Sequence, residues 1–383
     1  MKFAQSTYNR IFSSTEGRAI VTQILANPDL IRANHTFWRD HFKVDGSVTP
    51  TSAEGEAVFI SRMKKMQAGT LMDMRAPLGN PLPEDKLGIE YYTGAIPQFS
   101  TKDTTENAME RDYKENLFAQ FGDAALIAEY ATEVLQGKID SVNQTLSHMG
   151  AQLLSSGYIT YSQGQGIQSN VIKANIPAAN FLKAGAKVWT DTTARILDQM
   201  RKIESDVKES TGLNITYQWN ISRDMFINCF LPNAQVIEQY RYIKSLNNVL
   251  LPTTVQLTVE MALEAISFFE GISPIVLIEE KQNDTINGVV HGWKQGNAVL
   301  RPAGYAGLIR KAVPKDVDLF AKFGNKVNTY SVTPIVNGIA YLVNSEVMNG
   351  DFREWHTYAL AASVPSLDEF LYHYIIDTTT ANS

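Results

Sequence analysis

The sequence predicts an α+β fold organised around one long helix. Between Glu106 and Ser156, apolar or small residues recur in alternating steps of four and three, which places them in one stripe on a helix face. Residues 57–105 are instead dense in Pro and Gly, which oppose a helix and favour extended, hairpin-like segments. The rest of the chain mixes short strands and helices without a repeat, which is typical of α+β proteins and not of βαβ winding.

The helical stripe would run without interruption over most of this segment. Its members are Leu117, Phe121, Ala125, Ala128, Thr132, Leu135, Ile139, Val142, Leu146, Met149 and Leu153. At 1.5 Å per residue the whole segment would reach roughly 75 Å. We expect any break at Gly137, because a Gly inside a helix costs up to about 1 kcal/mol relative to Ala. The periodicity fits a coiled-coil or bundle helix as well as a helix lying across a sheet, and it leaves both open.

Ahead of this helix, the sequence predicts an arm and a long loop. Residues 1–56 are expected to form an arm with short helices, in which the crowded Phe37 and Trp38 dock onto a core of the same chain or of another. The loop at 57–105 is too long for an ordinary connection, and its apolar and aromatic content argues against disorder. We therefore expect it to extend from the body and to pack on another subunit.

After the long helix, the sequence predicts several elements with recognisable ends. Gly157 is expected to cap the helix before a strand at Tyr158–Tyr161, and Gly212 to end a helix that Thr190 or Asp191 caps at its start. Further helices are expected at 223–247 and 253–269, and further strands at 215–219, 274–280, 288–291, 298–300, 336–343, 355–364 and 371–376.

Composition bounds the class of protein. The 383 residues suffice for two or three compact units, and a hydrophobic content of 44% supports a buried core. A formal net charge of −6 argues against a strongly basic nucleic-acid surface. The single Cys229 cannot form an internal disulfide, and we expect it to be a small buried hydrophobe. Because no signal-like or membrane-spanning apolar run occurs, we expect a soluble protein made in the cytoplasm, without membrane contact.

No motif predicts catalysis, a metal site or a cofactor. The six His residues lack metal-ligand spacing, and Gly164-x-Gly166 lacks the third glycine of a dinucleotide site. The pair Glu279-Glu280 specifies nothing alone, and the basic cluster Arg62, Lys64 and Lys65 is expected to be a solvated face. We therefore expect no catalytic, metal-binding or cofactor-binding residue, and a structural or binding role in place of an enzyme.

The order of these pieces resembles a known family. The helix end, Gly and strand at Thr145–Thr160 are similar to those of the major capsid proteins of the lambda-like tailed bacteriophages. Trp189–Met200 resembles their Trp-x-Asp entry to the next helix, and Trp293–Gly307 resembles their late strand and glycine turn. Arg75–Gly79 is weakly similar to the Ala-Pro step of their extended loop. The resemblance covers about residues 70–376, although the predicted helix is longer than the family suggests.

The resemblance implies the Hong Kong 97-type capsid fold, with a long spine helix, an extended loop hairpin, and peripheral and axial domains. The implied boundaries are an N-terminal arm at 1–56, the extended loop at 57–105, a peripheral domain with the spine helix at 106–187, an axial domain at 188–321, and C-terminal strands of the peripheral domain at 322–383.

The resemblance also implies a function in the virion. The chain would self-assemble as pentamers and hexamers into an icosahedral head shell, built in the host bacterial cytoplasm, that encloses double-stranded DNA without sequence-specific binding. Its other partners would be a scaffolding protein acting in trans, a portal and, where one exists, a decoration protein. We predict no covalent cross-link between subunits, since no motif places a Lys beside an Asn. The mild negative charge suits a wall that must not hold packaged DNA tightly.

Candidate contact residues follow from the predicted loop and arm. Arg75, Glu84 and Lys86 near the loop tip are expected to form ion pairs between subunits, although they could equally be ordinary solvated charges. Phe37 and Trp38 of the arm are candidates for apolar contacts between subunits. The alternatives to a capsid protein are an encapsulin-like compartment shell, another phage structural protein such as a tail-tube subunit, and a soluble enzyme with an unrecognised site.

Overall fold

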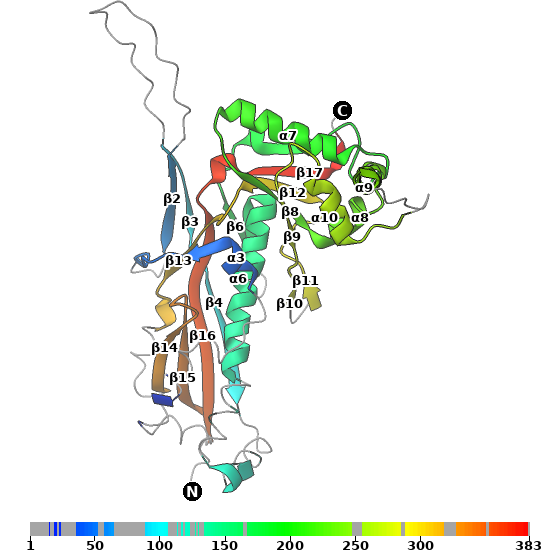
Figure 1. Ribbon diagram of the computed structural model, residues 1–383. Coiled ribbons are helices and arrows are strands. Elements are labelled where there is room, and N and C mark those ends of the chain that lie inside the picture. Colours follow the sequence, from blue (N-terminus) through cyan, green and yellow to red (C-terminus); the bar gives the residue numbers. More distant parts are fainter. Residues whose placement is uncertain are drawn as a thin grey trace, which may run out of the picture.

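The computed structural model shows an elongated molecule with two limbs (Figure 1). One limb carries a long sheet beside helix α6 (Gln136–Ser156), and the other carries a second sheet and most of the remaining helices. The residues described are 15, 19–20, 23, 36–52, 57–64, 89–105, 113, 116–117, 119–122, 127, 129, 134–163, 167–246, 255–284, 288–317, 327–349 and 352–381.

The long limb is built around one central strand. Strand β16 pairs with β15 along one edge, and its other edge pairs first with β4 and then with β13. Strand β14 extends the sheet beyond β15, and β1 extends it beyond β13 in parallel orientation. The strands of this six-stranded sheet are β1 (Phe42–Val44), β4 (Gln98–Thr105), β13 (Gly307–Ala312), β14 (Val327–Ile335), β15 (Ala340–Asn349) and β16 (Phe352–Leu367).

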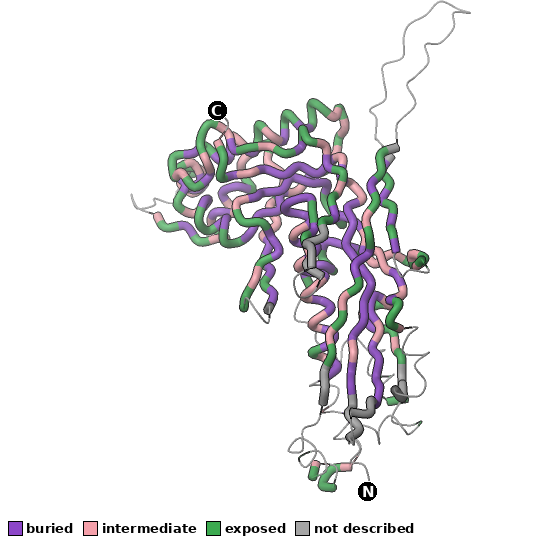
Figure 2. The backbone as a smooth tube through the Cα atoms, turned by 180° about the vertical axis from the view of Figure 1, so that it is seen from behind, coloured by how far each residue is buried: buried purple, intermediate pink, exposed green. Residues whose placement is uncertain are grey.

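The second limb contains a five-stranded sheet whose order mixes early and late parts of the chain. In spatial order its strands are β7 (Phe181–Ala184), β17 (Tyr374–Ala381), β12 (Asn297–Pro302), β8 (Tyr217–Ser222) and β9 (Ile275–Ile278). Its helices are α7 (Ile196–Thr211), α8 (Arg223–Cys229), α9 (Ala234–Leu246) and α10 (Val259–Ser267). Trp189 packs edge-on against Phe230 and tilted against Trp219, and these buried rings form the centre of this limb. Figure 2 shows buried residues running through both sheets.

Helix α6 confirms the second half of the predicted stripe. Leu135, just ahead of the helix, and Ile139, Val142, Leu146, Met149 and Leu153 are all buried. The helix ends as predicted at Gly157, whose positive φ of 79° lets its N–H bond to the Leu153 carbonyl. Gly150 has a packing role, since a Cβ there would lie 2.9 Å from the Phe42 ring. The arm therefore packs closely against this helix.

The prediction of one unbroken stripe with a weak point at Gly137 is wrong. Gly137 lies inside α6, whereas Gly122 has a φ of 75°, which an α-helix cannot accommodate. Just before it, Phe121 is 66% exposed and therefore does not continue the apolar face. The break lies fifteen residues earlier than expected because sequence periodicity does not report which Gly adopts a left-handed conformation.

Several other predictions need correction in detail. Helix α7 ends at Gly212 as predicted but begins at Ile196, because Asp191 instead accepts hydrogen bonds from Thr193 within a local turn. The helix expected at 223–247 is two helices, α8 and α9. Strand β15 begins at Ala340, since Val336 has a positive φ in the preceding turn. The hairpin formed by β5 (Tyr158–Gln163) and β6 (Ile167–Lys173) was predicted only in its first strand.

The predicted extended hairpin is present at its base. Strand β2 (Val58–Lys64) pairs antiparallel with β3 (Ile89–Ala95), and residues 65–88 between them lie outside the described part of the chain. A third hairpin, β10 (Gln282–Asp284) with β11 (Gly288–Val290), leaves the second limb beside α6. The arm contributes helix α3 (Phe37–His41) and strand β1, both packed against the long limb.

We expect opposite effects from placing Ala at two glycines of α6. Gly157→Ala should lower the unfolding free energy by about 1–2 kcal/mol, because a side chain is strained at positive φ and its Cβ would lie 2.9 Å from Ile176. Gly137→Ala should raise it by up to about 1 kcal/mol, since that helix position has no atom within 4 Å of the added Cβ. Urea unfolding of the two variants and the parent measures both. Equal effects would contradict the assigned helix end.

Candidate subunit interface

The hairpin β2–β3 has two different faces. Along β2, Phe59, Ser61 and Met63 point inward and are buried, as is Tyr92 of β3. The alternate residues Val58, Ile60 and Tyr91 are 53%, 47% and 62% exposed, and together they form the outer face of the hairpin. One face of this two-stranded unit is therefore packed on its own chain, and the other presents apolar side chains to the surroundings (Figure 2).

The inner face is held by hydrogen bonds to one peptide unit at the end of β16. The Tyr92 hydroxyl accepts from the Leu367 N–H at 2.7 Å, and it lies 3.2 Å from the Leu367 carbonyl. Ser61 donates to the same carbonyl at 2.8 Å. Tyr92 also meets Phe59 and Phe370 edge-on, with ring centroids 5.8 and 5.2 Å apart. These contacts fix the direction in which the hairpin leaves the body.

An Arg between two carboxylates lies next to this anchor. Arg310 of β13 is 2.7 Å from Asp45 and 3.3 Å from Asp368, so it joins the arm to the end of β16. Although burial alone would raise the pKa of Asp45, hydrogen bonds from Ser47 and Arg310 hold that pKa below its ordinary value. Burial raises the pKa of Asp368, and Arg310 offsets part of this effect. Because these groups are half-buried, the pairs are screened less than exposed ones.

The arm is docked inside its own chain. Trp38 donates from Nε1 to Asn143 of α6 at 2.9 Å, and β1 pairs with β13. Phe37 and Trp38 are only 8% and 1% exposed, so they occupy the same-chain alternative left open by the sequence. They leave almost no surface for another subunit, and we replace them as contact candidates with the exposed side chains of the hairpin.

A buried Arg lies where the arm meets both sheets. Arg301 donates to the carbonyls of Pro302 and Gly304 and to Nδ1 of His41, the last at 3.1 Å. Burial, reinforced by the Arg301 charge, lowers the pKa of His41 to about 3, so this imidazole is neutral and accepts. Burial also lowers the pKa of His373 to about 4, although its hydrogen bond to Leu154 opposes this. Burial raises the pKa of the nearby Glu369, partly offset by Arg301.

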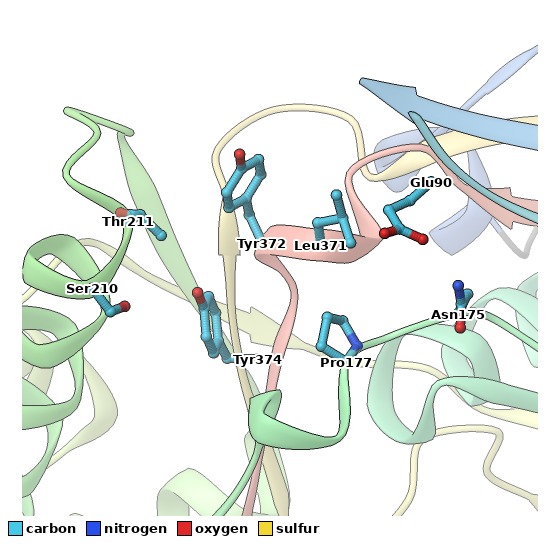
Figure 3. Close-up of a pocket in the computed structure, with 8 residues that line it drawn as sticks. All are labelled: Glu90, Asn175, Pro177, Ser210, Thr211, Leu371, Tyr372 and Tyr374. Carbon is cyan, nitrogen blue, oxygen red and sulfur yellow. The ribbon is translucent and has the colours of Figure 1, made fainter. Parts of the chain in front are cut away.

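A groove lies between the hairpin, the end of α7 and β17. Its volume is about 440 Å³, and a second hollow of about 450 Å³ adjoins it, with Ser210 and Tyr374 lining both. Figure 3 shows Tyr372 and Tyr374 beside the end of α7, with Pro177 lying between them and Glu90 of β3. The lining residues of the first hollow are Glu90, Asn175, Pro177, Ser210, Thr211, Leu371, Tyr372 and Tyr374.

A second apolar surface lies at the far end of the other limb. Tyr242 and Leu246 of α9 are 60% and 65% exposed, and Phe268 after α10 is 62% exposed. Helices α9 and α10 are tied together by the ion pair between Lys244 and Glu264. An exposed apolar group of this kind is typical of a contact surface.

The described part of the chain offers little catalytic chemistry. Among those residues, no three His, Cys, Asp or Glu side chains lie close enough to hold a metal ion, and no helix is long and apolar enough to cross a membrane. Cys229 is buried as predicted, which raises its thiol pKa to about 11. Glu280 accepts from the Trp293 N–H, and Glu279 pairs with Arg223, so the carboxylate pair is divided between two structural contacts.

Sequence reasoning found the hairpin but not the residues that hold it. Arg75, Glu84 and Lys86 lie outside the described residues, and their contacts stay predictions. It missed Tyr92 and Arg310, whose partners lie 275 and 265 positions away in the chain. The period-2 alternation of Phe59, Ser61 and Met63 was the available signal for a buried inner face.

Comparison with known proteins connects this geometry to a fold. No protein-family model and no curated protein matches the sequence. A candidate capsid protein of a prophage of E. coli CFT073 is 13% identical, with a TM-score of 0.54, over 95% of this chain and 98% of that one. The chain has a phage capsid protein fold.

Two further solved structures match over similar lengths. A phage-related protein from Bordetella bronchiseptica RB50 is 13% identical over 94% of this chain and 97% of that one, with a TM-score of 0.45. The capsid of Myoviridae phage XM1 is 11% identical over 90% and 92%, with a TM-score of 0.41. Since both scores lie below 0.5, the assignment of the capsid fold depends on the E. coli prophage protein.

Within this capsid fold, Tyr92→Phe should loosen the hairpin. The change removes the hydroxyl that accepts from the Leu367 N–H, and a buried donor left without a partner costs about 1–3 kcal/mol. We expect faster amide hydrogen exchange throughout β2 and β3. Tyr91→Phe, at a ring that is 62% exposed, is the matched control and should leave exchange unchanged. Identical exchange in the two variants would show that the hydroxyl does not anchor the hairpin.

The buried His41 should make stability fall in mild acid. Its pKa is about 3 in the folded chain and 6.5 in an exposed one, so between these values the unfolded chain binds more protons. Stability therefore falls as pH drops from 6.5 toward 3, by up to about 1.4 kcal/mol per pH unit for this group. Urea unfolding of parent and His41→Gln at pH 8, 6 and 5 should show a shallower loss in the variant. Parallel curves would contradict this assignment.

Proposed function

We propose that this chain is a major capsid protein, which self-assembles into the icosahedral head shell of a tailed bacteriophage. The observation that carries the proposal is the fold, shared over 95% of this chain with the candidate prophage capsid protein. The sparse chemistry of the described residues is consistent with a structural role.

The proposed shell uses the Hong Kong 97-type arrangement. Helix α6 would be the spine helix and the β2–β3 hairpin the base of the extended loop. We propose a peripheral domain comprising α6 and the six-stranded sheet, and an axial domain comprising the five-stranded sheet. This moves β7 and β17 to the axial domain and β13 to the peripheral domain, relative to boundaries at 187 and 321, because each strand pairs within the other sheet.

The exposed apolar surfaces support a repeating contact. In the proposed shell, the outer face of the hairpin covers the adjacent subunit, and the surface formed by Tyr242, Leu246 and Phe268 lies where axial domains meet in pentamers and hexamers. Many modest contacts of this kind add up in a closed symmetric assembly. The partners would be further copies of this chain, a scaffolding protein in trans, a portal and enclosed double-stranded DNA held without sequence specificity.

Sedimentation of the purified full chain, with negative-stain microscopy of every fast fraction, tests the proposal. We expect closed shells, or rings of five or six subunits, with or without a co-expressed scaffolding protein from the same genome. Monomers or small oligomers under all conditions, scaffold included, would overturn it. Shells that enclose a host enzyme instead of forming DNA-filled heads would favour an encapsulin-like compartment.

A further inference from the structure

We propose that the groove beside Tyr372 and Tyr374 is the seat for the proline-rich tip of the β2–β3 hairpin of a second copy of this chain. This inference rests on the proposed shell function, and it names the surface and the side chains that receive the tip. The tip is the segment Arg75-Ala-Pro-Leu-Gly-Asn-Pro-Leu-Pro-Glu-Asp-Lys86.

The composition of the segment determines what kind of surface it can bind. Pro77, Pro81 and Pro83 each fix φ near −65° and push the preceding residue toward extended conformations. Such a segment favours the polyproline II conformation, in which no backbone group is bonded internally. Proteins recognise that conformation with shallow grooves lined by aromatic side chains, because little conformational entropy is lost on docking.

The groove has the matching features. Tyr372 and Tyr374 contribute ring edges, being 5% and 7% exposed, and Pro177 and Leu371 line the same hollow. Ser210 and Thr211 place hydroxyl groups at its border, where they can pair with the free backbone groups of an extended segment. With hollows of about 440 and 450 Å³, the pair suits a narrow peptide and not a folded domain.

Charge gives the docked segment a direction. Glu90 lines the first hollow, and Lys183 and Lys202 line the second. The segment carries Arg75 at its start and the acidic pair Glu84-Asp85 nine residues later, a span of about 28 Å in the polyproline II conformation. Seating Arg75 at Glu90 brings the acidic pair toward the lysines, whereas the reverse direction juxtaposes like charges. The middle of the segment, Asn80, then lies over Ser210, which lines both hollows.

A second copy fits better than the same chain. Glu90 follows directly on the strand end from which the segment leaves, so docking in the same copy would require the chain to reverse on itself within a few residues. The inner-face anchor at Tyr92 directs the hairpin away from the body, and a neighbouring copy needs no such reversal. Docking within the same copy is an outcome of the test.

Cysteine pairs measure the contact directly. We would introduce Asn80→Cys with Ser210→Cys and oxidise the protein with copper phenanthroline. The matched control pairs Asn80→Cys with Ser205→Cys, an exposed position on α7 outside the lining of either hollow. The native Cys229 gives little background, because it is 3% exposed and burial raises its pKa to about 11. We expect covalent oligomers at least about fivefold more abundant with the 80/210 pair than with the control.

Mixing single variants separates the two geometries. Subunits with only Asn80→Cys, assembled with subunits carrying only Ser210→Cys, can form a disulfide only between copies. Covalent dimers in that mixture support the inference. A disulfide within monomers of the double variant but none in the mixture overturns it, as does equal cross-linking of the 80/210 and 80/205 pairs.

A peptide assay distinguishes failure of the groove from failure of the shell. A fluorescent peptide of residues 75–86 should bind the unassembled full chain, and Glu90→Lys should weaken binding about two- to fivefold at low salt, as for an exposed ion pair. Shells that form without cross-linking and without peptide binding would refute the seat but leave the capsid function intact. Peptide binding by a chain that never assembles would refute the capsid function instead.

Discussion

Strand β16 is the element on which the rest of this molecule depends. Its backbone is bonded along both edges, to β15 on one side and in succession to β4 and β13 on the other. The peptide unit at its end, Leu367, also receives Tyr92 and Ser61 from the hairpin. Because backbone hydrogen bonds are buried and directional, these pairings fix the angle between hairpin and sheet more firmly than apolar contact alone.

Charged groups concentrate where the two sheets join. The chain crosses between them twice, from β12 to β13 and from β16 to β17, and Arg301, Arg310, Asp368 and Glu369 lie at these crossings. A buried charge costs free energy unless other groups solvate it, and here backbone carbonyls and the neutral His41 solvate Arg301. The joint is therefore specific in geometry, since a shift of either sheet would leave a buried cation without its acceptors.

Local signals in the sequence predicted local structure well. The apolar spacing identified α6, and Gly157 and Gly212 marked two helix ends because both need a left-handed conformation. The hairpin base was predictable from Pro, Gly and alternating residues. The long-range partners were not, since nothing near Tyr92 in the chain indicates that it meets Leu367. The same holds for Phe37 and Trp38, whose burial depends on a helix one hundred residues further on.

The base of the hairpin explains why one subunit alone is an incomplete unit. A two-stranded hairpin is at best marginally stable by itself in water, so it must pack against something. On its inner side, Tyr92 and its neighbours bind the body, which fixes the position of the strands. On its outer side, Val58, Ile60 and Tyr91 stay exposed, although burying each such side chain gains about 1.5–3 kcal/mol. A second copy that covers this face supplies the missing burial, and in a closed shell every copy both gives and receives it.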